Sequence, residues 1–192
     1  MRIIAGEFRG SLLPSPPDRA TRPITDRVKT SLFDTLAGKL PGAVVLDLFA
    51  GTGSLGLEAL SRGASGAVFV ERRAQVADLL KSVIERFDLG ARARVHVADA
   101  YNPPPTPFDG PNGYTMVFVD PPYRMSHAVA GGDPLGKLML KLDEENLLAQ
   151  NAVVVLRHDQ RANVADVFGR LELRKHRKYG SMVLRWYQCL GP

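Results

Sequence analysis

Short apolar runs and apolar positions at helical spacing alternate along most of this chain. Five apolar runs predict buried strands, which fall at residues 43–48, 67–71, 94–99, 114–120 and 152–158. Between them, apolar residues recur every three or four positions, which predicts helices over residues 54–62, 75–87 and 134–142. Strands that alternate with helices in this way form a parallel sheet that is covered by helices.

The segments outside this alternation extend the predicted fold. Residues 26–37 have apolar positions on one helical face, and residues 161–169 predict a further short helix. Residues 171–178 and 181–188 flank Tyr179–Gly180, which predicts a β-hairpin that brings antiparallel pairing into the sheet.

The complete pattern predicts an α/β, Rossmann-like fold. We expect a mostly parallel sheet of seven strands with a final antiparallel hairpin. Residues 1–24 predict short strands and turns, which would form a small N-terminal β extension. Residues 25–192 would form the main domain.

Composition narrows the class of protein. The chain has 192 residues, of which 45% are hydrophobic and 23% charged, as in one globular domain and unlike disordered or fibrous chains. No apolar run approaches the ~18 residues of a membrane span, and the first ten residues lack the apolar core of a secretory signal. A single cysteine, Cys189, fits a reducing cytoplasm. Cys189 and the four histidines lack metal-ligand spacing, so we expect a cytoplasmic protein with no metal and no membrane partner.

Positive charge is concentrated at the two ends of the chain. The net charge is +5, and residues 1–40 carry seven Lys/Arg against four Asp/Glu, while residues 170–192 carry six against one. Basic surfaces beside an acidic body suit a polyanionic partner with a site for a cationic ligand. The candidates for contacts with a nucleic acid are Arg2, Arg9, Arg22, Arg174 and Lys178.

Four consecutive strands of the predicted sheet end in a carboxylate. These acids are Asp47, Glu71, Asp99 and Asp120. A single acid at a strand end is adequately explained as a turn former or a helix cap. The carboxyl ends of parallel strands, however, meet at one edge of the sheet, where α/β proteins bind ligands. Four acids at this edge therefore favour a binding site.

A glycine-rich loop follows the first of these strands. Its sequence, Gly51-Thr-Gly53-Ser-Leu-Gly56, fits the dinucleotide pattern G-x-G-x-x-G, so a nicotinamide-binding protein is an open alternative. Glycines allow a tight turn whose backbone amides approach a ligand. Asp47, four residues before Gly51, is a poor neighbour for a pyrophosphate. It is a good neighbour for an amine and a sulfonium, which S-adenosylmethionine (SAM) carries.

The other acids also suit SAM. Glu71 is expected to accept hydrogen bonds from the two ribose hydroxyls, and Asp99 from the adenine amino group. The predicted cofactor residues are Asp47, Phe49, Gly51, Gly53, Glu71, Asp99 and Ala100.

The fourth strand ends in a motif that predicts methylation of an exocyclic amine on a base. The motif is Asp120-Pro121-Pro122-Tyr123, and all four residues are candidate catalytic residues. The lone pair of such an amine is delocalised into the ring, so the nitrogen is a poor nucleophile. The Asp120 carboxylate and the Pro121 carbonyl would accept its hydrogens and aim the lone pair at the methyl group. Prolines hold these acceptors rigidly, and Tyr123 offers a face on which an unstacked base can lie.

These motifs resemble the RsmD-type guanine-N2 methyltransferases of small-subunit ribosomal RNA. The resemblance extends over RIIAGEFRG, RPITDRVKTSLFDTL, VLDLFAGTGSLGLEALSRGA, FVE, VFVDPPYR and RKYGSMVLRWYQ. It implies SAM as the cofactor and the N2 of a guanine in 16S ribosomal RNA as the acceptor, at a guanine-966-type site. The substrate would be the small subunit or an assembly intermediate. Residues 25–27 would help to close the cofactor site, and the basic N-terminal hairpin would meet RNA.

Other functions also fit parts of the sequence. An adenine-N6 methyltransferase is the nearest alternative, because the motif that ends in Tyr123 occurs in such enzymes too. An NAD-dependent oxidoreductase rests on the glycine loop alone. A non-catalytic RNA-binding protein would not need Asp120 and Tyr123. Methylation at cytosine C5 would need a cysteine nucleophile, and Cys189 lies far along the chain from the predicted site.

Overall fold

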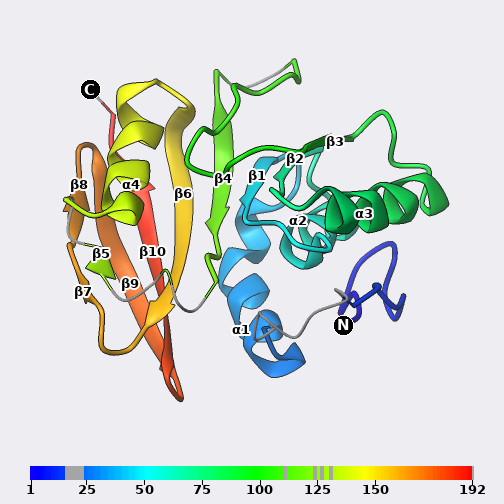
Figure 1. The fold of residues 1–192 in the computed structure, drawn as a ribbon, viewed down its shortest axis with the longest axis horizontal. Coiled ribbons are helices and arrows are strands. Elements are labelled where there is room, and N and C mark those ends of the chain that lie inside the picture. The colour runs from blue at the N-terminus through cyan, green and yellow to red at the C-terminus, as the bar shows by residue number, and fades with distance from the viewer. Residues whose placement is uncertain (16–23, 110–111, 123–124, 126–127, 130–131, 192) are drawn as a thin grey trace.

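The computed structural model describes residues 1–15, 24–109, 112–122, 125, 128–129 and 132–191. Its main feature is an eight-stranded sheet with the order β3-β2-β1-β4-β6-β10-β9-β8 (Figure 1). Its strands are β1 (Val44–Leu48), β2 (Gly66–Val70), β3 (Ala93–His96), β4 (Tyr114–Val119), β6 (Leu148–Asp159), β8 (Val167–Phe168), β9 (Leu171–Tyr179) and β10 (Met182–Cys189). The strands from β3 to β6 are parallel, and β10, β9 and β8 each pair antiparallel with the strand before them. The Rossmann-like α/β fold with its final hairpin is therefore confirmed.

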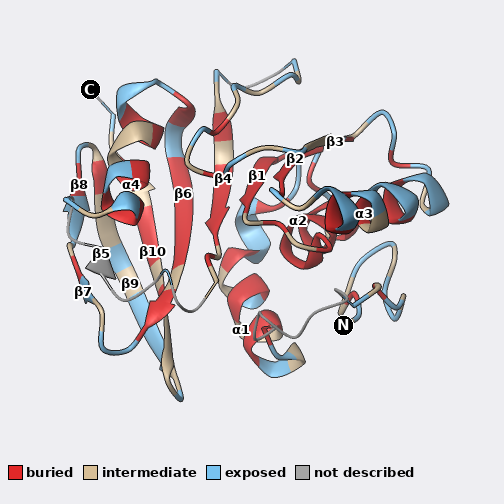
Figure 2. Ribbon diagram, in the orientation of Figure 1, coloured by how far each residue is buried: buried red, intermediate tan, exposed pale blue. Residues whose placement is uncertain are grey.

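Helices cover both faces of this sheet. They are α1 (Asp26–Leu36), α2 (Ser54–Ser61), α3 (Ala74–Arg86) and α4 (Pro134–Glu144), and the 3₁₀ turn η1 (Ala37–Lys39) follows α1. Successive strand residues point to opposite faces, so Val45 packs with α1, α2 and α3, whereas Val44 and Leu46 pack with α4. Figure 2 shows the central strands buried on both faces. This two-sided burial explains why these strands are continuous apolar runs in the sequence.

The helix predicted over residues 161–169 is wrong. This segment forms β7 (Asn163–Val164) and β8, in which Val164 and Phe168 are buried. Their four-residue spacing also fits one face of a helix, which explains the prediction. In the structure, β8 pairs with β9, and β7 pairs with β5 (Ala128–Val129). Tertiary pairing has overridden a local pattern. The main sheet thus contains the seven predicted strands and the two-residue β8 at its edge.

The N-terminal segment folds back on itself and packs against α2. Arg2 and Leu12 form an isolated antiparallel bridge, and Ile3 and Leu13 are buried. The amide of Glu7 donates to the carbonyl of Ser61 at 2.7 Å. The division at residue 24 into an extension and a main domain stays a prediction, and residues 16–23 lie outside the described part of the chain.

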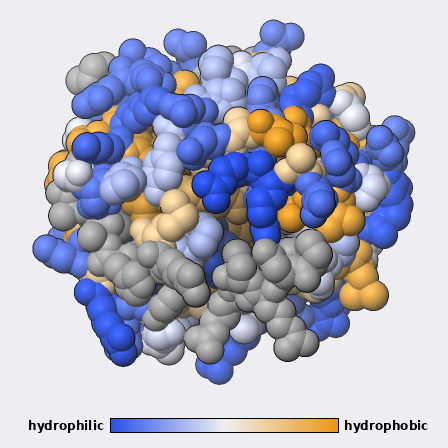
Figure 3. All heavy atoms as spheres, in the orientation of Figure 1, coloured by the Kyte–Doolittle hydropathy of each residue, from blue (hydrophilic) through white to orange (hydrophobic). Residues whose placement is uncertain are grey.

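The described surface is mostly hydrophilic. On the face that Figure 3 shows, apolar residues form small patches among polar ones. Large apolar side chains that are exposed include Leu12, Val97, Met125 and Val167. Among the described residues, no helix has the length and apolar character needed to cross a membrane, and no group of His, Cys, Asp and Glu could hold a metal ion.

Candidate functional site

Three of the four predicted acids lie together at the carboxyl edge of the central strands. Asp47 is in β1, Glu71 directly follows β2, and Asp120 directly follows β4. Leu48 of β1 is opposite the last residue of β2 on one side and the last residue of β4 on the other. Glu71 and Asp120 therefore flank the beginning of the glycine loop. Asp99 is exposed and lies three residues beyond β3.

Two of these carboxylates hold the glycine loop. Glu71 Oε2 accepts a hydrogen bond from the Gly51 amide at 3.0 Å, and Asp47 Oδ2 accepts one from the Gly56 amide at 2.8 Å. Gly51 and Gly53 have φ angles of 56° and 80°, in the region that favours glycine. A Cβ at Gly53 would lie 2.5 Å from a side chain of α3, whereas a Cβ at Gly51 would meet no atom within 4 Å. The backbone of Gly51 therefore borders open space.

Asp47 is the most deeply buried acid of the edge, with 1% of its surface exposed. Burial raises the pKa of Asp47 well above its ordinary value, and the negative charges of Asp120 and Glu71 raise it further. The hydrogen bond from Gly56 opposes this rise. Asp47 is thus an acceptor for the beginning of α2, a role that the sequence did not indicate.

Asp120 forms an ion pair with Arg157 of β6, a residue that the sequence analysis missed. Leu156 of β6 is opposite Val119 of β4. The residues that follow them, Arg157 and Asp120, are therefore next to each other. Burial raises the pKa of Asp120, and the Arg157 guanidinium opposes this rise. A basic residue in the apolar run AVVVLRH was the available signal, because a buried strand holds a charge only where it finds a partner.

The remaining predicted site residues lie beside these groups or outside the described residues. Pro121 is buried and Pro122 is half-buried, which keeps the backbone after Asp120 against the protein. Tyr123 falls outside the described part of the chain. Its proposed contact with a base stays a prediction.

An aromatic pair connects the glycine loop to the chain after β3. The ring of Phe49, a residue with a φ of 60°, packs edge-on against Tyr101 with 5.7 Å between centroids. The Asp99 carboxylate accepts a hydrogen bond from the Tyr101 amide at 3.1 Å. Ala100, the residue between these two in the sequence, is buried. Burial raises the pKa of Tyr101, and the charges of Asp99 and Asp133 add to this effect. Tyr101 is a second residue of this edge that sequence reasoning missed.

Known proteins match this chain over nearly all of its length. The model of a family described as conserved hypothetical protein 95 matches residues 1–188. The chain belongs to this family. Ribosomal RNA small subunit methyltransferase D of Escherichia coli (strain K12) is 34% identical over 190 residues, which are 98% of this chain and 89% of that protein. The resemblance to the RsmD type is thereby confirmed.

Solved structures give the same result for the fold. "Putative methyltransferase yhhF" from Escherichia coli has a TM-score of 0.82 at 34% identity, over 100% of this chain and 99% of that one. An RNA methyltransferase from Salinibacter ruber, solved in complex with S-adenosyl-L-homocysteine, has a TM-score of 0.60 at 14% identity, over 89% and 95% of the two chains. At that identity the likeness is one of fold alone.

In this member of the conserved hypothetical protein 95 family, a buried acid ties the N-terminal segment to α2. Glu58 is fully buried and accepts hydrogen bonds from the amides of Ile4 at 2.7 Å and Ala5 at 3.1 Å. It also pairs with Arg62 at 2.7 Å and with Lys29 at 3.2 Å. The Lys29 ammonium donates to the hydroxyl of the residue that begins α2. The glycine loop, α1 and the N-terminal segment therefore share one polar cluster.

The predicted RNA contacts lie on two separate surfaces. Arg2 and Arg9 are exposed on the N-terminal segment, and Arg2 pairs with Asp26 at 2.8 Å. Arg174 and Lys178 are exposed on β9, where Arg174 pairs with Glu172 at 3.4 Å. Arg22 lies outside the described residues.

Proposed function

We propose that this protein transfers a methyl group from SAM to the exocyclic N2 of a guanine in 16S ribosomal RNA, in the small subunit or an assembly intermediate. One observation carries the proposal. A half-buried carboxylate, Asp120, is fixed by Arg157 beside a glycine loop that Asp47 and Glu71 hold at the same edge. The related methyltransferase D supports ribosomal RNA methylation as the general activity. The choice of guanine N2 rests on the resemblance of the motifs. This substrate would place the reaction in the cytoplasm.

The residues of the carboxyl edge fit SAM. Open space beside the Gly51 backbone leaves room for a ligand, and acidic groups stand on both sides of the loop. Asp47 would provide negative charge for the ligand amine and sulfonium, while Glu71 and Asp99 would accept hydrogen bonds from the ribose and the adenine. SAM supplies an electrophilic methyl group when bound. A carboxylate-lined site of this kind is unfavourable for the pyrophosphate of a nicotinamide cofactor.

The acceptor base would be held by Asp120 and the residues after it. The Asp120 carboxylate, kept in place by Arg157, would accept one amine hydrogen, and the Pro121 carbonyl would accept the other. Both acceptors are preorganised, since one is ion-paired and the other belongs to a proline segment. Tyr123 would stack on the base. These contacts would direct the nitrogen lone pair toward the methyl group and leave its proton with the carboxylate or with water.

The RNA would meet the basic surfaces at the two ends of the chain. Arg2 and Arg9 project from the N-terminal segment, and Arg174 and Lys178 from β9. We propose Arg22 as a further contact from the sequence. Phosphate contacts of this kind position a nucleic acid and do not read its bases.

Methyl transfer from labelled SAM to small-subunit particles tests the proposal, followed by nucleoside mass spectrometry. We expect N2-methylguanosine, and we expect Asp120→Ala to lower turnover by roughly 10²-fold or more, because one oriented acceptor is removed. SAM affinity in calorimetry should change little in this variant. Asp78→Asn on α3, which removes an exposed carboxylate that pairs with Lys81, is the matched control and should retain full turnover.

Each other result assigns the site differently. If the product is N6-methyladenosine, the acceptor base is adenine and not guanine. Binding of NADH without binding of SAM would favour an oxidoreductase. Full turnover of Asp120→Ala would reduce the proline motif to a turn that ends a strand.

A further inference from the structure

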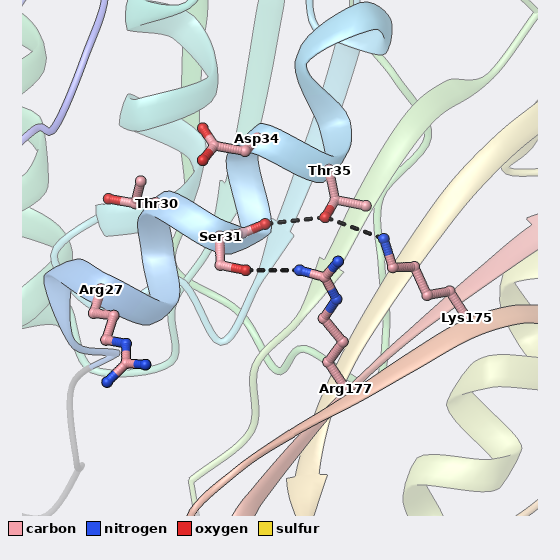
Figure 4. A pocket seen from close by; sticks show the side chains of 7 residues that line it. All are labelled: Arg27, Thr30, Ser31, Asp34, Thr35, Lys175 and Arg177. Atoms are coloured by element: carbon pink, nitrogen blue, oxygen red, sulfur yellow. Dashed lines mark hydrogen bonds between the residues drawn. The ribbon is translucent and has the colours of Figure 1, made fainter.

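A polar groove lies between α1 and β9, on the face of the sheet opposite α4. It has a volume of about 510 Å³ and is lined by hydroxyl groups and by three basic side chains. Figure 4 shows Lys175 and Arg177 extending from β9 toward α1, with Arg27 near the beginning of the helix. The hydroxyl residues are Thr30, Ser31 and Thr35. The sequence analysis did not connect α1 with the basic C-terminal strand.

A β-bulge places the basic residues on this face. Leu173 is opposite Tyr187 and packs on the α4 side, whereas Lys175 is opposite Trp186, which packs on the α1 side. In a regular strand, residues two apart such as Leu173 and Lys175 would point to the same side, and the bulge at Arg174 breaks this alternation. The bulge therefore turns Lys175 and, two residues later, Arg177 toward α1.

Neutral groups alone hold these cations in the described part of the chain. Arg177 donates to the Ser31 hydroxyl at 3.0 Å, and the Lys175 ammonium lies 3.5 Å from the Thr35 hydroxyl and 5.6 Å from the Trp186 ring centroid. The acid of the groove, Asp34, lies 3.8 Å from Arg62 on its other side. No carboxylate of a described residue forms an ion pair with Lys175 or Arg177, so their charge is available to an anion.

The groove is in register with the candidate catalytic carboxylate. Arg177 is opposite Leu184, Leu184 is opposite Arg157, and Arg157 pairs with Asp120. Three strand spacings of ~4.8 Å separate the backbones of Arg177 and Asp120, which gives about 14 Å. Residues opposite each other share a face of the sheet, so Arg157 and Arg177 both belong to the α1 side. Figure 1 shows the β9–β10 turn and the beginning of α1 at the end of the sheet where β4 ends.

We propose that this groove binds backbone phosphates of the RNA strand that carries the acceptor base, a few nucleotides away from that base. The guanidinium and ammonium groups match phosphate oxygens. The hydroxyls of Thr30 and Thr35 donate to backbone carbonyls of α1, so the cations would hold the phosphates. A groove that continues along a strand suits a chain of phosphates better than a single small anion. The inference rests on the proposed function and adds to it a track that sets the position of the base at Asp120.

The test compares two double variants that remove the same charge. Lys175→Gln with Arg177→Gln empties the groove of its strand cations. Lys39→Gln with Lys137→Gln removes two exposed lysines from η1 and α4, away from the groove. The probe for binding is a labelled single-stranded fragment of 16S ribosomal RNA, and its affinity is measured by fluorescence anisotropy over a range of salt concentrations.

For the groove variant, we expect the log–log salt slope to fall by about 1.4, at ~0.7 for each phosphate neutralised on a single strand. KM for the RNA should rise with kcat nearly unchanged, and SAM affinity should stay that of the parent. The control variant should show a much smaller fall in the slope. Arg177→Lys, which keeps the charge, should recover most of the affinity. Thermal unfolding of each variant shows whether the fold is kept.

Two results would contradict the proposal that the groove binds RNA, and both can be distinguished from a failure of methyl transfer. An unchanged slope in the groove variant, or an equal fall in the control variant, would show that the charges act only as a general field. If the parent binds RNA through the groove and transfers no methyl group, the proposed function fails and the groove stands. If the parent methylates RNA and the groove variant does so with the same KM, the groove fails alone.

Discussion

At the carboxyl edge of the sheet, Asp47 is buried and Asp120 is half-buried, and the loss of water makes each carboxyl harder to ionise. Burial is the first cause of the raised pKa in both groups. Their partners differ, because Asp47 accepts from the Gly56 amide and Asp120 pairs with Arg157. Two like groups in different surroundings commonly take different roles at a functional site.

Substitution of Asp47 should separate stability from ligand binding. Asp47→Ala leaves the Gly56 amide without its acceptor, so the free energy of unfolding should fall by about 1–3 kcal/mol. Asp47→Asn keeps an acceptor oxygen and removes a buried charge, so stability at neutral pH should be retained or raised. Both variants should bind SAM more weakly in calorimetry, because the counter-charge to the ligand is gone.

The pH dependence of this stability follows from the direction of the pKa. A raised pKa in the folded state means that folding favours the protonated carboxyl. The contribution of Asp47 is then fully present below its ordinary pKa and is lost as the pH rises through the raised value. Urea unfolding of the parent and Asp47→Asn should therefore give a difference in favour of Asn that grows with pH. A difference that shrinks with pH would contradict this account.

Arg157 should set the acid limb of the reaction. In the proposed mechanism, methyl transfer needs an ionised Asp120 as acceptor, so turnover should fall as the pH drops through the pKa of that carboxyl. Since Arg157 lowers a pKa that burial raises, Arg157→Gln should move the acid limb of the kcat profile to higher pH. Arg157→Lys should restore most of the parental profile. A uniform fall in kcat at all pH values would instead indicate a purely structural residue.

At the scale of elements, the polar cluster around Glu58 joins the N-terminal segment, α1 and α2. Glu58→Gln would leave Lys29 buried without its counter-charge, and it would weaken the hydrogen bonds from the amides of Ile4 and Ala5. Breaking a buried pair costs about 3–5 kcal/mol, so we expect a decrease of that size in chemical unfolding. Asp34→Asn, at the exposed end of the pair with Arg62, should change stability by less than about 1 kcal/mol.

Most elements could be predicted from the sequence because two-sided burial leaves a strong pattern. The continuous apolar runs indicated β1, β2, β4 and β6, and the turn at Tyr179–Gly180 indicated the hairpin of β9 and β10. The error at residues 161–169 arose where the local spacing fits both structures and pairing with β9 decides. A two-residue strand has too few positions to show its period.

The carboxyl edge was predictable for a different reason. Parallel strands that end in acids must place them at one edge, which follows from topology alone. Arg157 and Tyr101 were missed because their partners come from register and from side-chain packing, and no local motif marks them. The face on which Lys175 lies depends on a bulge, which the alternation of the sequence does not show.

For the whole molecule, the positive charge at the two ends of the chain should determine how tightly the protein binds RNA. Arg2→Gln with Arg9→Gln should lower the slope of log affinity against log salt by up to about 0.9 for each duplex phosphate that these arginines neutralise in the parent. SAM affinity should not change, because these residues lie on the N-terminal segment, away from the carboxyl edge. Anisotropy and calorimetry on the same preparations check both statements. An unchanged slope would remove the N-terminal segment from the RNA surface.

The place of β10 has a consequence for how the chain is made. This strand is synthesised after β9, yet it lies between β6 and β9. Until residues 182–189 emerge, β6 has an unpaired edge. β9 cannot yet join the sheet, because β10, the strand that connects it to β6, has not been synthesised. Folding from the N-terminus can therefore build the layer that holds the glycine loop early. The basic strand that lines the groove is added in the final step, so a nascent chain would acquire the glycine loop before the groove that we propose for RNA.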